Sequence, residues 1–382
     1  MRIAFVYLSN FKDWPSGGML SYVRNLLPYF YVDGKSDIEY WGCSVDQIKR
    51  DKFAIHGREY NLNLYSDVKT SKKIIPNFFR SFLGIIRASS KFRKYDILYS
   101  HTSATTIGLK LTHPKKFVVH HQHGLSYVEN KSITGFLNIG YMIAQKLADM
   151  SFFVASENEL MQYQENHRFL FRNKRFYSIG SPVELIGAVS HPVKKKWDGV
   201  QFIYTGRLTA WKNVGFILEA YKEYLSSSAT KSRLFIVGEG VEKSFLEAKS
   251  VEIGISSNVI FTGNLDHAQV IEYLQQSDVF LFSSKGEGVS VSILEALSCG
   301  IPVVACNAIG VNNLVLNGIT GYLVERNIND FAEKMISAVE NKASFYDKCR
   351  CFAEKFESVH ISERIMGAIN NEYHNKKNIT RY

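Results

Sequence analysis

The feature that most constrains the fold is an alternation, repeated along the chain, of short apolar segments with segments long enough for a helix. The apolar segments cover residues 3–8, 97–100, 117–120, 151–155, 201–204, 233–237, 259–261, 279–282 and 302–305. Continuous apolar strands separated by helices are typical of parallel sheets that are covered on both faces. The sequence therefore predicts an α/β fold.

The alternation occurs twice, with a break near residues 181–199, where Ser-Pro, His-Pro and Lys-Lys-Lys interrupt any periodicity. A chain of 382 residues also fits two domains better than one. We therefore predict an N-terminal Rossmann-like domain at 1–187, a hinge at 188–199, a C-terminal Rossmann-like domain at 200–360, and a final helix at 361–382 that returns to the first domain. Doubly wound domains bind ligands at the carboxyl ends of their strands, so we expect the site in a cleft between two facing domains.

The positive charge is concentrated in the first half. Through Lys195 there are 27 Lys and Arg against 15 Asp and Glu, a balance of +12, whereas the remainder has a balance of −2. A basic half can meet nucleic acid, anionic lipid or phosphorylated substrates, because each presents dense negative charge. The charge alone does not choose between them.

The cysteines and the apolar runs restrict the cellular compartment in which we expect the protein. Five cysteines without a C-x-x-C pair suggest neither a disulfide framework nor a zinc ribbon, so a reduced cytosol is the simpler setting. No run reaches the roughly 20 apolar residues that span a bilayer, since residues 139–155 are interrupted by Lys146 and Asp149. The first residues read as a strand, not as a signal peptide.

The most informative segment is residues 283–305, S-S-K-G-E-G-V-S-V-S-I-L-E-A-L-S-C-G-I-P-V-V-A. It predicts a strand end, a glycine-bearing loop, a helix from about Val289 to Ser298, and the next strand. Loop glycines and free helix-start amides favour a phosphate there. Glu287 precedes the helix and Glu295 lies about two turns into it, so the two carboxylates can accept hydrogen bonds from hydroxyls of one extended ligand. The alternative is that both glutamates are solvated.

A second segment, T-G-R-L-T-A-W-K-N at 205–213, directly follows a predicted strand. It places Arg207 and Lys212 on one loop, where both can reach a diphosphate, Arg as a bidentate fork and Lys as a point charge. The alternative is two unrelated surface cations. The V-G-E-G segment at 237–240 ends another strand and is a weak signal alone.

Taken together in order, these segments resemble the retaining GT-B glycosyltransferases of family 4, the glycosyl transferases group 1. The matching segments are Gly17-Gly18, residues 96–101, His123-Gly124, 206–208 with 212–213, 237–240, and 287–295 followed by Ala296, Gly300 and Pro302. The segment from Glu287 to Ala305 is highly specific, and the others support one another by their order. The resemblance covers nearly the whole chain.

The resemblance implies roles for the matched residues. It implies two doubly wound domains in the GT-B arrangement, with neither a cofactor nor a metal ion. Its catalytic residues would be Glu287, Arg207, Lys212 and His123. Its donor-binding residues would be Gly17, Gly18, Gly206, Gly238, Gly288, Val289, Ser290 and Glu295.

In this scheme Glu287 contacts the donor sugar, Glu295 holds the ribose hydroxyls, and Arg207 and Lys212 stabilise the departing diphosphate. Gly17-Gly18 would lie under the phosphates and His123 beside the reacting sugar. The chain departs from the family pattern at residues 310–313, G-V-N-N, where relatives commonly have a Gly-Gly pair followed by Glu.

The histidines of the segment His120-His121-Gln122-His123 could also form a metal-binding site. On a strand, residues 121 and 123 share a face while 120 points away, and no second ligand cluster with metal spacing is evident. An ordinary polar strand end is the alternative. The resemblance instead places His123 in the active site, with His101 as a further residue of the cleft.

Residues 69–94 contain eight basic residues and no acidic one. Apolar residues at helical spacing lie opposite the cations, which predicts a basic amphipathic helix. It can pack on the sheet as a crossover helix and still attract anionic lipid with its solvated face. The expected membrane contacts are Lys72, Lys73, Arg80, Arg87, Lys91, Arg93 and Lys94. We expect no nucleic acid partner, because no recognised binding module accompanies the charge.

The sequence thus predicts a retaining, metal-independent hexosyltransferase that uses a UDP-sugar, or alternatively a GDP-sugar, and a saccharide or lipid-linked glycan acceptor. The expected setting is bacterial surface polysaccharide or lipopolysaccharide biosynthesis, on the cytoplasmic face of the cell membrane and alongside other enzymes of that pathway. Two alternatives remain: an enzyme like a sugar-nucleotide epimerase, and a non-catalytic nucleotide-sugar-binding scaffold.

Overall fold

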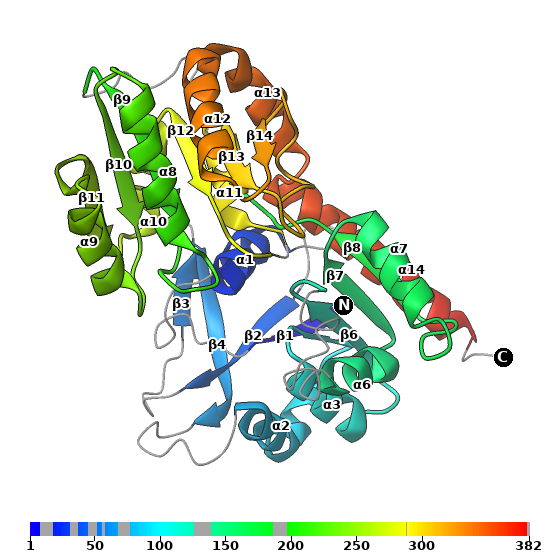
Figure 1. Ribbon diagram of the computed structural model, residues 1–382. Coiled ribbons are helices and arrows are strands. Elements are labelled where there is room, and N and C mark those ends of the chain that lie inside the picture. Colours follow the sequence, from blue (N-terminus) through cyan, green and yellow to red (C-terminus); the bar gives the residue numbers. More distant parts are fainter. Residues whose placement is uncertain are drawn as a thin grey trace. The chain divides into compact units, whose positions relative to one another are not determined.

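The computed structural model describes residues 1–7, 18–30, 37–44, 52–55, 58–67, 77–125, 139–185, 197–287 and 289–379. The chain forms two compact units (Figure 1): the first comprises Met1–Gly180 and Val359–Tyr382, and the second comprises Ser181–Ser358. Most of the predicted hinge, residues 188–196, lies outside the described residues, so the predicted domain boundaries stay a prediction.

The first unit contains an eight-stranded sheet in the order β3-β4-β2-β1-β5-β6-β7-β8. Its strands are β1 (Arg2–Val6), β2 (Asp37–Ser44), β3 (Lys52–Ile55), β4 (Arg58–Asp67), β5 (Ile97–Ser100), β6 (Phe117–Gln122), β7 (Met150–Val154) and β8 (Arg175–Ile179). Its helices are α1 (Gly18–Leu26), η1 (Leu27–Tyr29), α2 (Asn77–Arg87), η2 (Ser89–Lys94), α3 (Ser103–Thr112), α6 (Ile139–Leu147), α7 (Glu157–Asn166) and the larger part of α14 (Ser358–Ile379).

The expectation of purely parallel sheets is wrong at one edge of this sheet. β3 pairs antiparallel with β4, whereas the other neighbouring strands pair in parallel. Two residues separate β3 from β4 in the sequence. A parallel pair needs a crossover of about a dozen residues, so this short connection permits only a hairpin.

The second unit contains a six-stranded, wholly parallel sheet in the order β11-β10-β9-β12-β13-β14. Its strands are β9 (Val200–Thr205), β10 (Ser232–Val237), β11 (Val259–Gly263), β12 (Val279–Phe282), β13 (Val303–Cys306) and β14 (Gly321–Val324). Its helices are α8 (Val214–Ser227), α9 (Lys243–Glu252), η3 (Ser256–Asn258), α10 (His267–Gln276), α11 (Val291–Ser298), α12 (Ile328–Glu340) and α13 (Lys342–Glu354).

Both sheets reverse their strand order at one point. In the first sheet the chain proceeds from β1 outward to β2 on one side and to β5 on the other, and in the second sheet β9 and β12 stand in the same relation. The loops that follow such a pair of strands diverge to opposite faces of the sheet and leave a crevice at the strands' carboxyl ends, where ligands bind. The second crevice therefore lies between the loops that follow Thr205 and Phe282.

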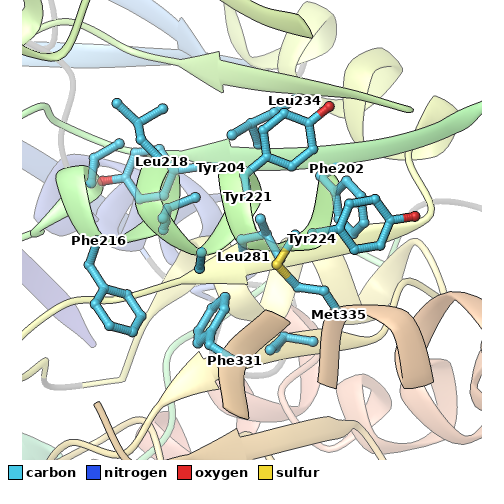
Figure 2. Close-up of a cluster of buried hydrophobic side chains, with 14 of the residues drawn as sticks. Phe202, Tyr204, Phe216, Leu218, Tyr221, Tyr224, Leu234, Leu281, Phe331 and Met335 are labelled. Atoms are coloured by element: carbon cyan, nitrogen blue, oxygen red, sulfur yellow. The ribbon is translucent and has the colours of Figure 1, made fainter. Parts of the chain in front are cut away.

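The core of the second unit explains why its strands are apolar on both faces. On one face, side chains from β9, α8 and α12 interdigitate (Figure 2); they include Phe202, Tyr221, Phe331 and Met335, all buried. The neighbouring Ile203 belongs to the separate cluster on the opposite face, together with residues of α10, α11 and α13. Helices thus cover both faces, as the continuous apolar runs predict.

Helix α14 is tied to the first unit by two groups of charges. Glu372 contacts Arg175 at 2.8 Å and accepts a hydrogen bond from Tyr177 at 2.7 Å. Lys376 lies 2.6 Å from Asp149, which also pairs with Lys110 at 2.7 Å. The Asp149 carboxylate in addition accepts the backbone N–H of Val118 at 2.8 Å, so one largely buried carboxylate joins three elements.

We predict that Asp149→Asn lowers the free energy of unfolding by about 2 kcal/mol, because it leaves two ammonium groups without their shared counter-ion. The loss is measured by chemical denaturation followed by circular dichroism. Asp198→Asn is the matched control, because Asp198 is 88% exposed and lies 3.6 Å from Lys231; it should change the same free energy by less than about 0.5 kcal/mol. Equal stability of the two variants would contradict the proposed tie.

Candidate functional site

The site of the second unit is built from the two loops at the crevice between β9 and β12. The loop after β9 is hydrogen-bonded along its length to the loop after β12. Lys285 donates its backbone N–H to the Trp211 carbonyl at 3.0 Å. The Ser283 hydroxyl donates to the carbonyls of Lys212 and Asn213, each at 2.9 Å. The two predicted motifs therefore form one structural element, although about 70 residues separate them in the sequence.

Glu287 and Lys212 form an ion pair between these loops, and their side chains are only 19% and 17% exposed. Ser284 donates a hydrogen bond to the same carboxylate oxygen, Oε1, at 2.6 Å. The backbone N–H of Glu287 donates to the Ile309 carbonyl at 3.0 Å. Among the described residues, Oε2 of Glu287 has no hydrogen-bond donor, so this oxygen can accept one from a ligand hydroxyl.

Arg207 lies on the same edge of the sheet, with its side chain exposed. Its carbonyl accepts a hydrogen bond from the Tyr204 hydroxyl at 3.2 Å. Burial raises the pKa of that hydroxyl, the Glu287 carboxylate raises this pKa further, and Arg207 opposes the change. Arg207 and Glu287 are therefore close enough to act electrostatically on one buried group, and the structure brings Arg207, Lys212 and Glu287 to a single edge.

Glycines allow the loops after β9 and β10 to pack backbone against backbone. Gly206 and Gly238 have φ angles of +154° and +136°, and a Cβ on Gly238 would lie 2.0 Å from the Gly206 carbonyl oxygen. A Cβ on Gly240 would lie 2.1 Å from the Leu208 carbonyl oxygen. Backbone packing already requires Gly238 and Gly240, whereas a Cβ on Gly206 would lie 2.7 Å from the Tyr204 hydroxyl. Donor binding by Gly206 and Gly238 stays a prediction.

Helix α11 begins at Val291, two residues later than predicted, with Ser290 as its N-cap residue. The Ser290 side chain does not cap the helix, and its hydroxyl lies 3.0 Å from that of Ser292. The first-turn N–H groups have no acceptor within the helix, which is the arrangement that favours an anion. Val289 and Ser290 lie at this helix start, and donor binding by them stays a prediction. Gly288 and Gly17 lie outside the described residues, and Gly18 begins α1.

Glu295 is a buried residue of α11, as its apolar neighbours in the sequence suggested. Its Oε1 lies 3.1 Å from Nε2 of His267, the first residue of α10. Sequence reasoning missed His267, because a single histidine at a helix start carries no local signal of a distant carboxylate. This contact holds the Glu295 carboxylate between two helices.

In the first unit, three histidines gather at the carboxyl ends of β5 and β6. Nδ1 of His101 lies 3.0 Å from Nε2 of His123, and the Tyr99 hydroxyl lies 2.5 Å from Nδ1 of His121. His121 and His123 share a face of β6, as predicted. His120 points to the other face, where its Nδ1 lies 2.8 Å from the Thr106 hydroxyl.

One nitrogen from each of His101, His121 and His123 lies within 4.8 Å of the others, so this cluster is the candidate for a metal ion. However, the His101 ring stacks on His121 at an interplanar angle of 17° and on His123 at 26°. Lone pairs lie in the ring planes, so stacked rings confine them to nearly parallel planes, whereas ligands of one ion must converge on a single point. The arrangement suits packed neutral imidazoles better than it suits metal ligands.

Burial keeps these imidazoles uncharged. It lowers the pKa of His120 to about 4 and that of His123 to about 3, with repulsion between protonated neighbours as a smaller cause for His123. The pKa values of His101 and His121 are also lowered by burial. At neutral pH, His123 can therefore donate one hydrogen bond and accept another, without carrying charge.

A buried chain of amides supports the turn that follows His123. Gln122 donates to the Gly124 carbonyl at 3.0 Å, Gln145 donates to Gln122 at 2.6 Å, and the Tyr163 hydroxyl donates to Gln145 at 2.8 Å. Gly124 has a φ of +91°, which favours glycine at this turn. Sequence reasoning missed these hydrogen bonds, because Gln122, Gln145 and Tyr163 come from separate elements.

The predicted basic face lies on α2 and η2. Arg87, Lys91, Arg93 and Lys94 are exposed, Arg80 is half-buried, and Lys94 pairs with Glu39. Lys72 and Lys73 lie outside the described residues. α2, α3 and α6 lie side by side (Figure 1), and the apolar residues exposed on α2 and α6 are Phe78, Phe79, Leu83, Ile139 and Ile143.

No helix in the described part of the chain has the length and apolar character needed to cross a membrane.

Two doubly wound units, with charged loops at the switch point of the second sheet, define an enzyme class built from two Rossmann-like domains. Residues 190–356, which make up most of the second unit, match the family Glycosyl transferases group 1.

Two relatives illustrate the similarity. An uncharacterized glycosyltransferase of Methanocaldococcus jannaschii is 27% identical over 352 residues, which are 85% of this chain and 86% of that protein. An Escherichia coli UDP-Gal:alpha-D-GlcNAc-diphosphoundecaprenol alpha-1,3-galactosyltransferase is 27% identical over 300 residues, 74% of this chain and 73% of that protein.

Solved structures show the same GT-B-like fold. The lipopolysaccharide outer core galactosyltransferase WaaB superposes with a TM-score of 0.71 at 19% identity, covering 97% of this chain and 100% of that one. Anabaena HepE in complex with UDP gives a TM-score of 0.71 at 18% identity, covering 97% of this chain and 100% of that one.

The buried histidines predict a pH dependence of stability. The unfolded state binds protons to histidine below a pKa of about 6.5, whereas folded His120 does so only below about 4. The free energy of unfolding should therefore fall as pH drops from 6.5 towards 4, by about 1.4 kcal/mol per pH unit for this one histidine. In denaturation at several pH values, His120→Asn should flatten this slope. His374→Asn, at an exposed position, should leave the slope unchanged, and an equal slope in all three proteins would contradict the neutral, buried His120.

Proposed function

We propose that this protein is a glycosyltransferase that transfers a hexosyl group, with retention, from a nucleotide-diphosphate sugar to a saccharide or lipid-linked glycan acceptor. We favour a UDP-sugar as the donor. The observation that carries the proposal is the Glu287–Lys212 pair, which joins the two loops at the switch point of the second sheet and is reinforced by Ser284. These groups match the needs of a sugar diphosphate, with a carboxylate for sugar hydroxyls and cations for phosphates.

The chemistry required is chiefly electrostatic. When the bond to the nucleoside diphosphate breaks, negative charge develops on the leaving phosphate, and prearranged cations and amides stabilise that charge. Lys212, Arg207 and the first turn of α11 supply these groups without a metal ion. In a front-face reaction the leaving phosphate takes the acceptor's proton, so the protein need supply neither a nucleophile nor a carboxylate dyad.

The names of the similar proteins support the finer parts of the proposal. The E. coli relative uses UDP-Gal and a diphosphoundecaprenol-linked acceptor, HepE binds UDP, and WaaB is a lipopolysaccharide galactosyltransferase. By analogy we propose a role in bacterial surface polysaccharide or lipopolysaccharide biosynthesis at the inner face of the cell membrane, beside other enzymes of that pathway. An epimerase-like enzyme would convert the donor without an acceptor, and a scaffold would bind it without turnover.

We expect Glu287→Gln to reduce transfer or donor hydrolysis by about 100-fold or more, because the neutral amide neither pairs with Lys212 nor accepts sugar hydroxyls with a charged oxygen. The assay is nucleoside-diphosphate release from a panel of UDP- and GDP-sugars, with thermal stabilisation by each donor as a measure of binding. Arg207→Ala should behave similarly.

Glu219→Gln is the matched control for this test. Glu219 pairs with Lys249 between α8 and α9, so the substitution also breaks a Lys–Glu pair of the second unit, but away from the crevice. This variant should keep normal turnover. A folded Glu287→Gln protein with near-normal turnover would refute the assignment.

We further propose that the basic face of the first unit binds anionic membrane. Cations of α2 and η2 flank the exposed apolar residues of α2 and α6, and such a combination suits the headgroup boundary, where apolar side chains insert and cations meet lipid phosphates. Phe79, with 54% of its surface exposed, is the most prominent of these apolar residues.

The double variant Arg87→Gln/Lys91→Gln should weaken partition onto anionic vesicles by about 30-fold, since each cation near the surface contributes about 1 kcal/mol. Vesicle sedimentation at low salt measures this. Lys222→Gln/Lys355→Gln removes two exposed charges from the second unit and should bind like the unaltered protein. If the unaltered protein does not prefer anionic over neutral vesicles, the membrane proposal fails.

A further inference from the structure

Two large apolar side chains are exposed beside Glu287. Trp211 is 53% exposed on the loop after β9, and Ile309 is 61% exposed on the loop after β13. Trp211 lies within the motif at 205–213, but the sequence motifs assign no role to either residue. Both stand at the carboxyl edge of the second sheet, where the charged residues of the site also lie.

Both residues are fixed to the short segment that carries Glu287. The indole N–H of Trp211 donates to the Gly286 carbonyl at 2.7 Å, and the Ile309 carbonyl accepts the backbone N–H of Glu287 at 3.0 Å. A Cβ on Gly286 would lie 3.5 Å from Cζ2 of Trp211, so the indole ring lies against this residue. Trp211 and Ile309 are therefore hydrogen-bonded to two consecutive residues, Gly286 and Glu287.

Single exposed apolar side chains are common and need no explanation. Here two such residues are fixed to the same two-residue segment, Trp211 by its indole N–H and Ile309 by its backbone carbonyl, next to a largely buried ion pair. A few fixed polar groups among apolar walls are the usual composition of a small-molecule site. Here Glu287 and Lys212 are the polar groups, and Trp211 and Ile309 are candidates for the walls.

The chemistry of the two side chains restricts what can lie against them. The only hydrogen-bond donor of the indole is already used by Gly286, and isoleucine has none. A sugar hydroxyl placed against either side chain would lose its water without gaining a partner, which is unfavourable. A methyl group in the same place would gain from burial.

We infer that Trp211 and Ile309 are specificity-determining residues that select a donor sugar bearing a methyl group, either in an acetamido substituent or in a 6-deoxy position. This inference rests on the proposed function, because it assigns the sugar held at Glu287. Ile309 directly precedes residues 310–313, where the chain departs from the family pattern. The donor preference therefore need not follow that of the similar proteins.

The test compares donors in pairs that differ in the methyl-bearing group: UDP-GlcNAc with UDP-Glc, UDP-GalNAc with UDP-Gal, and GDP-D-rhamnose with GDP-D-mannose. For one pair, kcat/KM of donor hydrolysis or transfer should favour the methyl-bearing donor by about tenfold or more, the range that one apolar contact gives. Ile309→Ala should reduce this ratio several-fold. Trp211→Phe, which keeps an aromatic face but loses the bond to Gly286, should reduce it less.

Ile319→Ala is the matched control. Ile319 is an isoleucine of comparable exposure, 46%, next to the amino end of β14 and so at the opposite edge of the same sheet. It should keep the donor ratio of the unaltered protein. Because the Ile309 side chain is largely exposed, Ile309→Ala should also keep the unaltered thermal midpoint, which separates a specificity effect from misfolding.

Two results would overturn the inference. One is an unaltered protein that prefers plain hexose donors in every pair, and the other is an Ile309→Ala variant with an unchanged ratio. If turnover in those cases still depends on Glu287, only the sugar assignment fails and the proposed function stands. If no nucleotide sugar is turned over or stabilises the unaltered protein, the proposed function fails and the inference falls with it.

Discussion

The reversal of strand order between β9 and β12 is the constraint on which the second unit's site depends. Because these strands are neighbours, the loops that follow them start side by side at the carboxyl edge, and their helices then lie on opposite faces of the sheet. Lys212 and Glu287 are 75 residues apart in sequence, yet they become partners through this topology. Ser283 and Trp211 then join the two loops by hydrogen bonds, and Ser284 bonds to Glu287 within the second loop.

The Glu287–Lys212 ion pair also explains how two charged side chains can be largely buried at this site without destabilising the fold. Two partly buried, opposite charges neutralise each other where either alone would be costly to desolvate. On our proposal, a nucleotide sugar offers both groups new partners, hydroxyls for Glu287 and phosphate oxygens for Lys212. Each group keeps a hydrogen-bonding partner throughout this exchange, and Arg207, already exposed at the same edge, adds further positive charge for the diphosphate.

The sequence predicted the elements that carry a strong local signal. β5 and β12 begin and end at the predicted residues, and the α/β class follows from the continuous apolar runs. β2, β4 and β8 were missed because polar residues interrupt their apolar ones, as in R-E-Y-N-L-N-L-Y-S-D of β4. The partners that are distant in sequence were missed for a different reason. The residues near Glu295 do not indicate a contact with His267, and those near His121 do not indicate a contact with Tyr99. Only the folded sheet brings these pairs together.

The glycines and the charged residues of the site differ in how strongly they indicate ligand binding. Backbone packing suffices to require Gly238, whose Cβ would collide with Gly206, so the V-G-E-G segment would be needed even in a protein that binds nothing. The same reasoning does not account for Glu287 and Lys212. Apolar residues of similar volume often stabilise a protein as well as a buried ion pair does, so stability alone gives no reason for charges at this position. A ligand with hydroxyls and phosphates does give one, and the pair is therefore a stronger indication of a nucleotide-sugar site than the glycine motifs around it.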